Sequence, residues 1–210
     1  MQVMTAPHLL SLVRCPEGSA TFERVKRYAC TRYADVHQAR LRHFLPLQIL
    51  LGDERHWLAS CGLRSADSHS LFLEQYLDRP VERALGSVTG NSLGRRQIVE
   101  VGNLAGEPGS ARLMILSLTR YLAQSGVDFV VFTATRELQH AFSRLGLATW
   151  FLAQASPERL GDEAADWGRY YSHAPAVFAG SVALGWLAIQ QQPLLMRMLR
   201  SVEPGVADAV

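Results

Sequence analysis

The segment "RRQIVEVGNLAGEPGSARLMI", residues 95–115, decides the fold and raises the main chemical question of this chain. Its first half has the short apolar pattern of a buried strand, but Glu100 lies among Ile98, Val99 and Val101. A carboxylate among apolar neighbours is costly unless it is paired, hydrogen-bonded or protonated. The segment then breaks at a glycine- and proline-rich turn and restarts as an apolar helix. We therefore expect strand, turn and helix, with a carboxylate that an ordinary strand does not explain.

The pattern downstream of this segment alternates between helix and strand. We expect a helix over 111–124, a strand over 127–135, a helix over 136–145 and a strand over 148–155. Strands separated by helices of this length predict parallel crossovers in a mixed central sheet with helices on both faces. The fold class is therefore α/β or α+β.

The pattern upstream predicts a helix and then an antiparallel hairpin. Ser19 is placed to cap the helix, and "LPLQILLGDERHWLASCGLR" reads as two strands joined by a tight turn at Gly52 and Asp53. The following stretch, "LFLEQYLDRPVERAL", is expected to be helical, with Pro80 opening a new helix or marking a bend.

The last part of the chain predicts an edge strand after Pro175 and a helical stretch over 181–199 that Pro193 interrupts. Its broad apolar surface is expected to pack on the sheet or against a second copy of the chain rather than to enter a membrane. We expect one main domain over 1–180, with 181–210 as a helical extension packed on it.

Composition limits the class of protein. The chain has 210 residues, of which 48% are hydrophobic, and its net charge of +2 is too mild to indicate nucleic-acid binding. Its three cysteines form no CxxC pair and suit a reducing compartment. The first 15 residues lack the pattern of a signal peptide, and the apolar run over 176–189 is short for a membrane span. A cytoplasmic location is expected.

Two common kinds of catalysis are disfavoured. The seven histidines show no HExxH or paired-ligand spacing, so no metal site is expected. No GxSxG motif is present, which argues against a serine hydrolase of the α/β class.

The turn "GEPGSAR", residues 106–112, is a candidate phosphate site. A strand that leads through a glycine-rich turn into a helix directs several backbone N–H groups and the positive end of the helix dipole at one point. Gly106 and Gly109 permit close approach, Ser110 is a plausible N-cap, and Arg112 adds a cation in the first turn. A plain turn without a ligand is the alternative reading.

The order of these elements, ending in "AFSRLGLATWFL", resembles the GNAT superfamily of acyltransferases. The triplet "GLR" at 62–64 and "EVGN" at 100–103 are similar to motifs of the acyl-homoserine-lactone and N-acyl amino acid synthases of that fold. Further motifs, "FLEQYLDRPVE", "IVEVGNLA", "FVVFTAT", "RLGL" and "WGRYY", resemble the bacterial thermostable hemolysin family from about residue 8 to 180. That family name records a lytic phenotype rather than a chemistry.

The resemblance implies roles for two charged residues. Glu100 takes the place of the carboxylate proposed to deprotonate an attacking amine, directly or through water, and a desolvated glutamate with a raised pKa suits that role. Arg64 then pairs with Glu100 or orients the acceptor. The alternative is a paired structural carboxylate, with Glu100 bridging Arg95, Arg96 or Arg64.

The resemblance also implies a donor site. Backbone N–H groups around Val101 to Leu104 are expected to hold the thioester carbonyl, and the turn is expected to hold the pantetheine and phosphate end of the donor. The expected donor-binding residues are Val101, Leu104, Gly106, Gly109, Ser110, Ala111, Arg112 and Phe142.

Two residues depart from the relatives. Asn103 stands where the synthases place an arginine, and Phe142 stands where many acetyltransferases have a tyrosine that protonates the leaving thiolate. Asn103 is kept as a candidate catalytic residue, and a thiolate leaves without an acid at neutral pH. Trp167, Tyr170 and Tyr171 are expected in the core or at its rim rather than in an acyl pocket.

The predicted function is transfer of a fatty acyl group from acyl carrier protein or acyl-CoA to a small amine such as an amino acid, with no permanently bound cofactor. The basic face of the first helix, with Arg24, Lys26 and Arg27, is either a solvated face or a docking surface for an acidic carrier protein. The alternatives are a directly membrane-active cytolysin and a GNAT-like binding protein that has lost catalysis.

Overall fold

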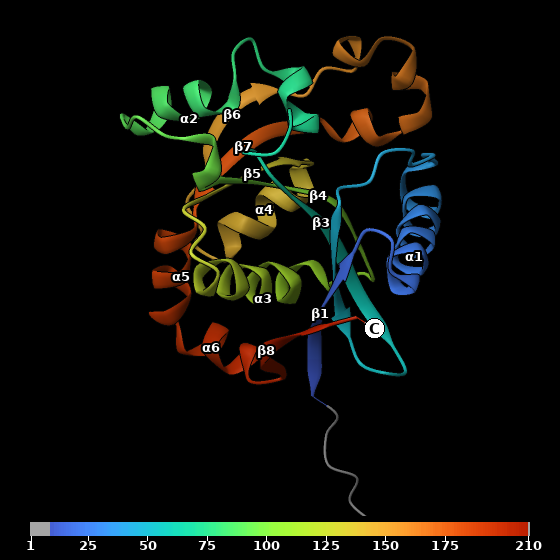
Figure 1. The fold of residues 1–210 in the computed structure, drawn as a ribbon, viewed down its shortest axis with the longest axis vertical. Coiled ribbons are helices and arrows are strands. Elements are labelled where there is room, and N and C mark those ends of the chain that lie inside the picture. The colour runs from blue at the N-terminus through green and yellow to red at the C-terminus, as the bar shows by residue number, and fades with distance from the viewer. Residues whose placement is uncertain (1–8, 210) are drawn as a thin grey trace, which may run out of the picture.

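The computed structural model describes residues 9–209, so 1–8 of the N-terminal stretch and residue 210 lie outside the described part. One mixed sheet forms the centre, in the order β6-β7-β5-β4-β3-β2-β1-β8 (Figure 1). The strands are β1 (Leu10–Pro16), β2 (Leu47–Gly52), β3 (Trp57–Ser65), β4 (Ile98–Gly106), β5 (Phe129–Ala134), β6 (Trp150–Gln154), β7 (Ala176–Ser181) and β8 (Val202–Asp208). β4 and β5 are parallel, as are β1 and β8, and the other neighbouring pairs are antiparallel.

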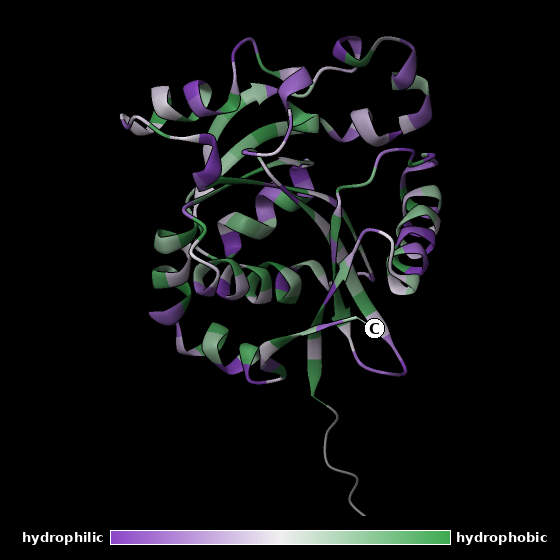
Figure 2. Cartoon of the chain, viewed as in Figure 1, coloured by the Kyte–Doolittle hydropathy of each residue, from purple (hydrophilic) through white to green (hydrophobic). Residues whose placement is uncertain are grey.

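Helices cover both faces of this sheet. They are α1 (Ala20–His37), α2 (Val81–Thr89), α3 (Ala111–Gln124), α4 (Arg136–Arg144), α5 (Val182–Gln190) and α6 (Pro193–Leu199), with short 3-10 helices η1 (Phe72–Tyr76), η2 (Arg95–Gln97), η3 (Pro157–Trp167) and η4 (Tyr170–His173). The buried side chains of α3 pack on β1 to β3, and α4 to α6 pack around α3. Those of α1, η1 and α2 form separate clusters with the strands. Figure 2 shows that the central strands are mostly hydrophobic, whereas α1 is mixed.

Most of the predicted elements are confirmed. The helix over 111–124 is α3, and the helix over 136–145 is α4. The Ser19 side chain accepts a hydrogen bond from the Phe22 N–H at 3.1 Å and so caps α1. The hairpin is β2 and β3, and its turn is closed by Asp53, whose Oδ1 accepts from the Arg55 and His56 N–H groups.

Two local predictions were wrong, and one was confirmed in part. The strand after Pro175 is β7, which lies between β5 and β6 rather than at an edge, because an apolar strand buried on both faces belongs inside the sheet. The stretch around Pro80 is helical over 72–76 and 81–89, and Pro80 immediately precedes the first residue of α2, so it opens a new helix as predicted. The extension over 181–210 has two helices, α5 and α6, but ends in strand β8 beside β1.

Candidate functional site

The parallel strands β4 and β5 separate part-way along the sheet. They pair from Ile98 with Phe129 to Val101 with Phe132, and β4 continues to Gly106 beyond that point. The backbone of β4 past Val101 therefore has its β5-facing side free to bind another molecule. Such an opening in a sheet presents N–H and C=O groups that a ligand has to satisfy.

A β-bulge bends β4 where the strands separate. Asn103 has φ of 50°, and the register with β3 shifts so that Gly62 opposes Gly102 while Ser60 opposes Ala105. The Asn103 Oδ1 accepts from the Leu45 N–H at 3.0 Å, and its Nδ2 donates to the His43 carbonyl at 2.9 Å. The amide side chain therefore ties the bulge to the loop before β2, a positioning contact that the sequence did not reveal.

The glycine of the "GLR" triplet has a steric reason. A Cβ on Gly62 would lie 2.6 Å from the Gln48 Nε2 and 2.9 Å from the Asn103 Oδ1. Only glycine at this position leaves space for the Asn103 side chain to cross β3. The contacts of the bulge therefore require the glycine of the triplet.

A cavity of about 1360 Å³ extends from this opening over the start of α3. It brings together every site residue that the sequence predicts: Arg64, Glu100, Val101, Asn103, Leu104, Gly106, Gly109, Ser110, Ala111, Arg112 and Phe142. Their assembly in one cavity supports a common site, while the roles assigned to each residue stay predictions.

Glu100 is the buried carboxylate of the cavity, with 3% of its surface exposed. Its Oε2 accepts from the Phe72 N–H and its Oε1 from the Leu73 N–H, both at 2.9 Å. Burial raises the pKa of Glu100, and the two backbone hydrogen bonds and the nearby Arg64 charge offset only part of that effect. The two N–H groups therefore favour the carboxylate anion, but burial makes Glu100 bind a proton more readily than an exposed glutamate.

In the described part of the chain, no ion pair supports the alternative in which Glu100 is a paired structural carboxylate. Among residues 9–209 no arginine nitrogen lies within 4.0 Å of the Glu100 carboxylate. Arg64 is the cross-strand neighbour of Glu100, and its Nη1 donates to the Ser70 carbonyl at 3.5 Å. Arg95 binds Glu74 and Glu82 instead, at 2.8 and 2.9 Å.

The turn over 106–112 lies at the edge of the same cavity. Gly109 has φ of +85°, a conformation that favours glycine, and the turn leads into the N-terminus of α3. The first N–H groups of α3 have no acceptor within the helix and carry the positive end of its dipole. Ser110 precedes the helix, but its hydroxyl donates to the Glu107 carbonyl at 2.7 Å and does not cap α3.

Arg32 anchors this turn from α1. Its Nε and Nη2 donate to the Gly106 carbonyl at 3.0 and 2.8 Å. The sequence did not indicate this contact of Arg32, which only the tertiary fold shows. The turn is therefore fixed from outside the strand and helix that it joins.

Phe142 lies against Phe132 on the wall of the cavity. The two rings are stacked, with centroids 4.6 Å apart and an angle of 16° between their planes. The residue at this position therefore supplies an apolar surface and no proton.

Aromatic residues from several elements line the other end of the cavity, where the sequence analysis had not placed a site: His43, Phe72, Tyr76, Trp167 and Tyr170. Phe72 packs against Trp167, with ring centroids 5.8 Å apart. Tyr170 is 7% exposed and Trp167 contacts it, as expected for the rim of the core, but both also line the cavity, where the sequence analysis did not expect them. Only their apolar character could have indicated this wall.

The fold can be compared with that of solved structures. The chain has a GNAT-like fold, and three solved structures with that architecture are similar to it. BjaI, a CoA-dependent acyl-homoserine lactone synthase solved with SAM and isopentyl-CoA, is 11% identical, with a TM-score of 0.60 over 96% of this chain and 93% of its own. FeeM, an N-acyl amino acid synthase from uncultured soil microbes, is 14% identical, with a TM-score of 0.55 over 89% and 96%.

The third structure is a putative arylalkylamine N-acetyltransferase 7 from the yellow fever mosquito, 10% identical, with a TM-score of 0.52 over 80% and 86% of the two chains. The family is given by the sequence itself, because residues 15–186 match the model of the thermostable hemolysins. The chain belongs to the thermostable hemolysin family. No curated protein matches it. No helix within 9–209 is both long and apolar enough to cross a membrane.

Proposed function

We propose that this protein is an N-acyltransferase that moves a fatty acyl group from a thioester donor to a small amine. The observation that carries the proposal is the opening between β4 and β5, where the buried Glu100 and the N-terminus of α3 face one cavity. BjaI was solved with SAM and isopentyl-CoA, and FeeM is an N-acyl amino acid synthase, which supports this reaction class for the fold.

The reaction forms one bond and breaks one. The acceptor nitrogen attacks the thioester carbon, a C–N bond forms, and the C–S bond breaks to release the thiolate. Glu100 receives the proton that the amine loses, a role that its raised pKa favours. Backbone N–H groups of β4 beyond Val101 stabilise the oxyanion. Phe142 supplies no acid, so the thiol group leaves as thiolate.

The donor lies along the free edge of β4, with its phosphate at the turn over 106–112. The N–H groups that begin α3 and the cation of Arg112 suit a phosphodiester there. No cofactor stays bound between turnovers in this scheme, because acyl-CoA or acyl-phosphopantetheine enters as a substrate. The acceptor approaches from the aromatic end of the cavity, near Arg64.

The test is mass spectrometry of lipid extracts from cells that produce the wild type, beside cells with Glu100→Gln at matched soluble levels. We expect an N-acylated amine only with the wild type. The same species in both strains would support an acyltransferase but would show that Glu100 is not needed for the reaction. No new species in hosts of differing lipid and amine content would favour a binding protein that has lost catalysis.

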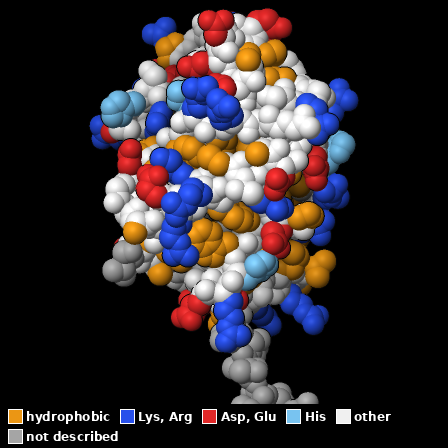
Figure 3. All heavy atoms as spheres, turned by 90° about the vertical axis from the view of Figure 1, so that its right-hand side faces the viewer, with side chains coloured by type: hydrophobic (Ala, Val, Ile, Leu, Met, Phe, Trp, Pro, Cys, Tyr) orange, Lys and Arg blue, Asp and Glu red, His pale blue; other side chains and the backbone are white. Residues whose placement is uncertain are grey.

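A carrier protein is the proposed donor partner. Arg24 and Arg27 line a pocket of about 490 Å³ that Glu107 also lines. Both arginines therefore lie beside the turn over 106–112, where the donor phosphate is proposed to bind. The guanidinium of Arg24 lies over the Trp57 ring at 4.9 Å, whereas Lys26 is paired with Glu23 at 3.2 Å. Figure 3 shows Lys and Arg side chains beside hydrophobic ones on the face of the molecule where α1 lies.

Charge reversal tests this partner. The double variant Arg24→Glu and Arg27→Glu is expected to raise the KM for acyl carrier protein and to leave the KM for acyl-CoA unchanged. Equal effects on both donors would point to a general loss of donor binding. Such a donor is available in the cytosol, which is the proposed location. That two copies of the chain form a homodimer stays a prediction.

Lysis, the phenotype in the family name, fits this function if the acylated product is the lytic agent. An amphiphile with a fatty chain disrupts bilayers without any pore in the protein. Lysis by protein that has been freed of lipid, with no donor or acceptor present, would instead favour a directly membrane-active cytolysin.

A further inference from the structure

The Glu100 carboxylate depends on one short helix for its hydrogen bonds. Both N–H groups that it accepts, from Phe72 and Leu73, belong to the first turn of η1. A helix of five residues is too short to be stable on its own. The orientation of the carboxylate is therefore only as firm as the contacts that fix η1.

Glu74 fixes that turn from within η1. Its Oε2 accepts from the Leu71 N–H at 2.7 Å, and its Oε1 accepts from the Val81 N–H at 2.9 Å. The first bond closes the start of η1 and the second joins it to the start of α2. One carboxylate thus holds two helix N-termini together.

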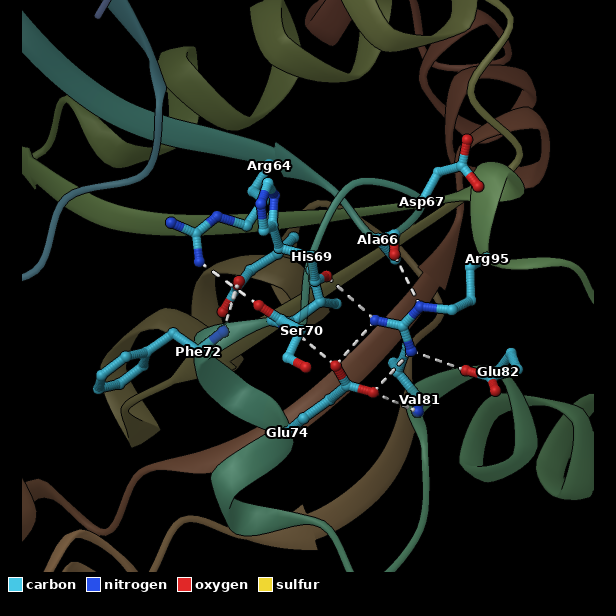
Figure 4. A network of polar contacts seen from close by, with 12 residues as sticks. Arg64, Ala66, Asp67, His69, Ser70, Phe72, Glu74, Val81, Glu82 and Arg95 are labelled. Carbon is cyan, nitrogen blue, oxygen red and sulfur yellow. Dashed lines mark hydrogen bonds and ion pairs between the residues drawn. The ribbon is translucent and has the colours of Figure 1, made fainter.

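Arg95 holds Glu74 and the surrounding loop (Figure 4). Its Nη1 and Nη2 form a fork with the two Glu74 oxygens at 2.8 and 2.9 Å, and Nη1 also binds Glu82 at 2.9 Å. Its Nε donates to the Ala66 carbonyl at 2.7 Å, and its Nη2 donates to the His69 carbonyl at 3.2 Å. The guanidinium thereby joins the segment after β3, η1 and α2.

This network connects to Glu100 in two ways. Arg95 is five residues before Glu100 in the same segment. This one stretch of chain therefore binds η1 through the Arg95 side chain and accepts hydrogen bonds from η1 at the Glu100 side chain. The charged and titratable groups that act on Glu100 are Arg64 from β3 and Glu74 and Tyr76 from η1, and the Tyr76 hydroxyl lies 2.7 Å from that of Tyr171. Of these, Glu74 is the like charge, and Arg95 neutralises it.

We propose that Arg95 and Glu74 are positioning residues: through η1 they hold the Phe72 and Leu73 N–H groups against Glu100 and fix the carboxylate that receives the acceptor's proton. The inference rests on the proposed function for the identity of the proton donor. The link between Arg95 and Glu100 itself is a property of the fold and can be measured without turnover.

The direct measurement is carboxyl-carbon NMR titration of protein labelled at glutamate, with the Glu100 signal assigned by its loss in Glu100→Gln. In Arg95→Met, Glu74 is left as an unpaired like charge and η1 is loosened, and both changes favour the protonated form of Glu100. We expect its titration midpoint to move to higher pH. The matched control is Arg159→Met, which removes an arginine from the exposed pair with Asp78 and should leave that midpoint in place.

The kinetic measurement separates positioning from folding. Arg95→Met is expected to lower kcat roughly ten- to hundredfold with less than a twofold change in acceptor KM. Combined with Glu100→Gln it should cause no further loss, because the two residues act through the same group. Arg95→Lys keeps the charge without the fork and should fall between wild type and Arg95→Met.

A folded Arg95→Met protein with an unmoved Glu100 midpoint would overturn the proposal, whether or not acyl transfer is detected. If Arg95→Met does not fold, Arg95→Lys is judged by the same criterion. Additive losses in the double variant would also overturn it, since they indicate a role independent of Glu100. A wild type that transfers no acyl group, but shows the shifted midpoint in Arg95→Met, would count against the proposed function alone.

Discussion

Glu74 and Glu100 both accept hydrogen bonds from backbone N–H groups around the start of η1, but their surroundings differ. The Glu74 side chain is 15% exposed and forms a two-point ion pair with Arg95, while Glu100 is 3% exposed and has backbone partners on both oxygens. Burial opposes ionisation of both, but for Glu74 the Arg95 and backbone hydrogen bonds outweigh it and hold the pKa at about 2. For Glu100 burial prevails and the pKa is raised.

The difference shows how one short helix can hold two carboxylates whose pKa values shift in opposite directions. A carboxylate paired with arginine stays ionised at every physiological pH and cannot exchange protons, so it suits a structural clamp. A buried carboxylate held only by N–H groups keeps a fixed place and can still take up a proton. In the proposed mechanism, the carboxylate paired with arginine is therefore the structural one of the two, and Glu100, which has no such pair, is the one that receives a proton.

The largest expected effect separates the two glutamates by activity. Glu100→Gln keeps the shape of the side chain and removes the base, so kcat/KM should fall by about 10²- to 10⁴-fold. Glu74→Gln, which acts only through η1, should cost roughly tenfold or less. Initial rates with one thioester donor and one amine measure both losses in kcat/KM. Circular dichroism is the check that both variants are folded. Equal losses would abolish the distinction.

For stability we expect the opposite order, with the larger loss in the Glu74 variant. Glu74→Gln removes the ion pair with Arg95 and should lower the free energy of unfolding at pH 7 by about 1–3 kcal/mol. Because the pKa of Glu74 is depressed, its contribution is present above the ordinary value of 4.5 and is lost as pH falls toward about 2. Urea unfolding of wild type and variant should therefore converge over that range. A difference that is constant with pH would contradict the ion-pair account.

The pH profile should report Glu100 and not Glu74. Since burial raises the pKa of Glu100, kcat/KM should fall on acidification with a midpoint above the ordinary glutamate value of 4.5, as the base becomes protonated. In Glu100→Gln that acid limb should disappear from the residual activity. An acid limb that persists in Glu100→Gln would assign the titration to another group.

Much of the fold was predictable because its signals are local. The helices α3 and α4 follow from apolar periodicity, and the hairpin of β2 and β3 from its turn residues. Strand β7 was predicted as an edge strand and β8 was not predicted, because the place of a strand in a sheet depends on partners far away in sequence. In the stretch around Pro80 the helix opening at Pro80 was predicted, but the contacts of Glu74 with Arg95 were not, because they join residues far apart in sequence.

The predicted residues do line one cavity, but their contacts could not be predicted. Glu100 is conspicuous in sequence because a charge interrupts an apolar strand, and the turn over 106–112 because glycines precede a helix. The sequence suggested Arg95, Arg96 or Arg64 as partners of Glu100, whereas the partners are backbone groups of Phe72 and Leu73. Backbone donors have no sequence signature, which is why the resemblance to known families could not reveal them.

The smallest expected effect concerns Arg64, for which the sequence left two roles open. Arg64 favours the ionised form of Glu100, so Arg64→Gln should raise the pKa of Glu100 and move the acid limb of kcat/KM to higher pH, while Arg64→Lys should leave it near the wild-type position. If this charge is its only role, rates well above the midpoint change little. A rise in acceptor KM at all pH values, in both variants, would instead assign Arg64 to the acceptor through the geometry of its guanidinium. Either result sharpens the contrast with Glu74, because Arg64 acts on the Glu100 carboxylate from the neighbouring strand without an ion pair, while Arg95 binds the Glu74 carboxylate directly.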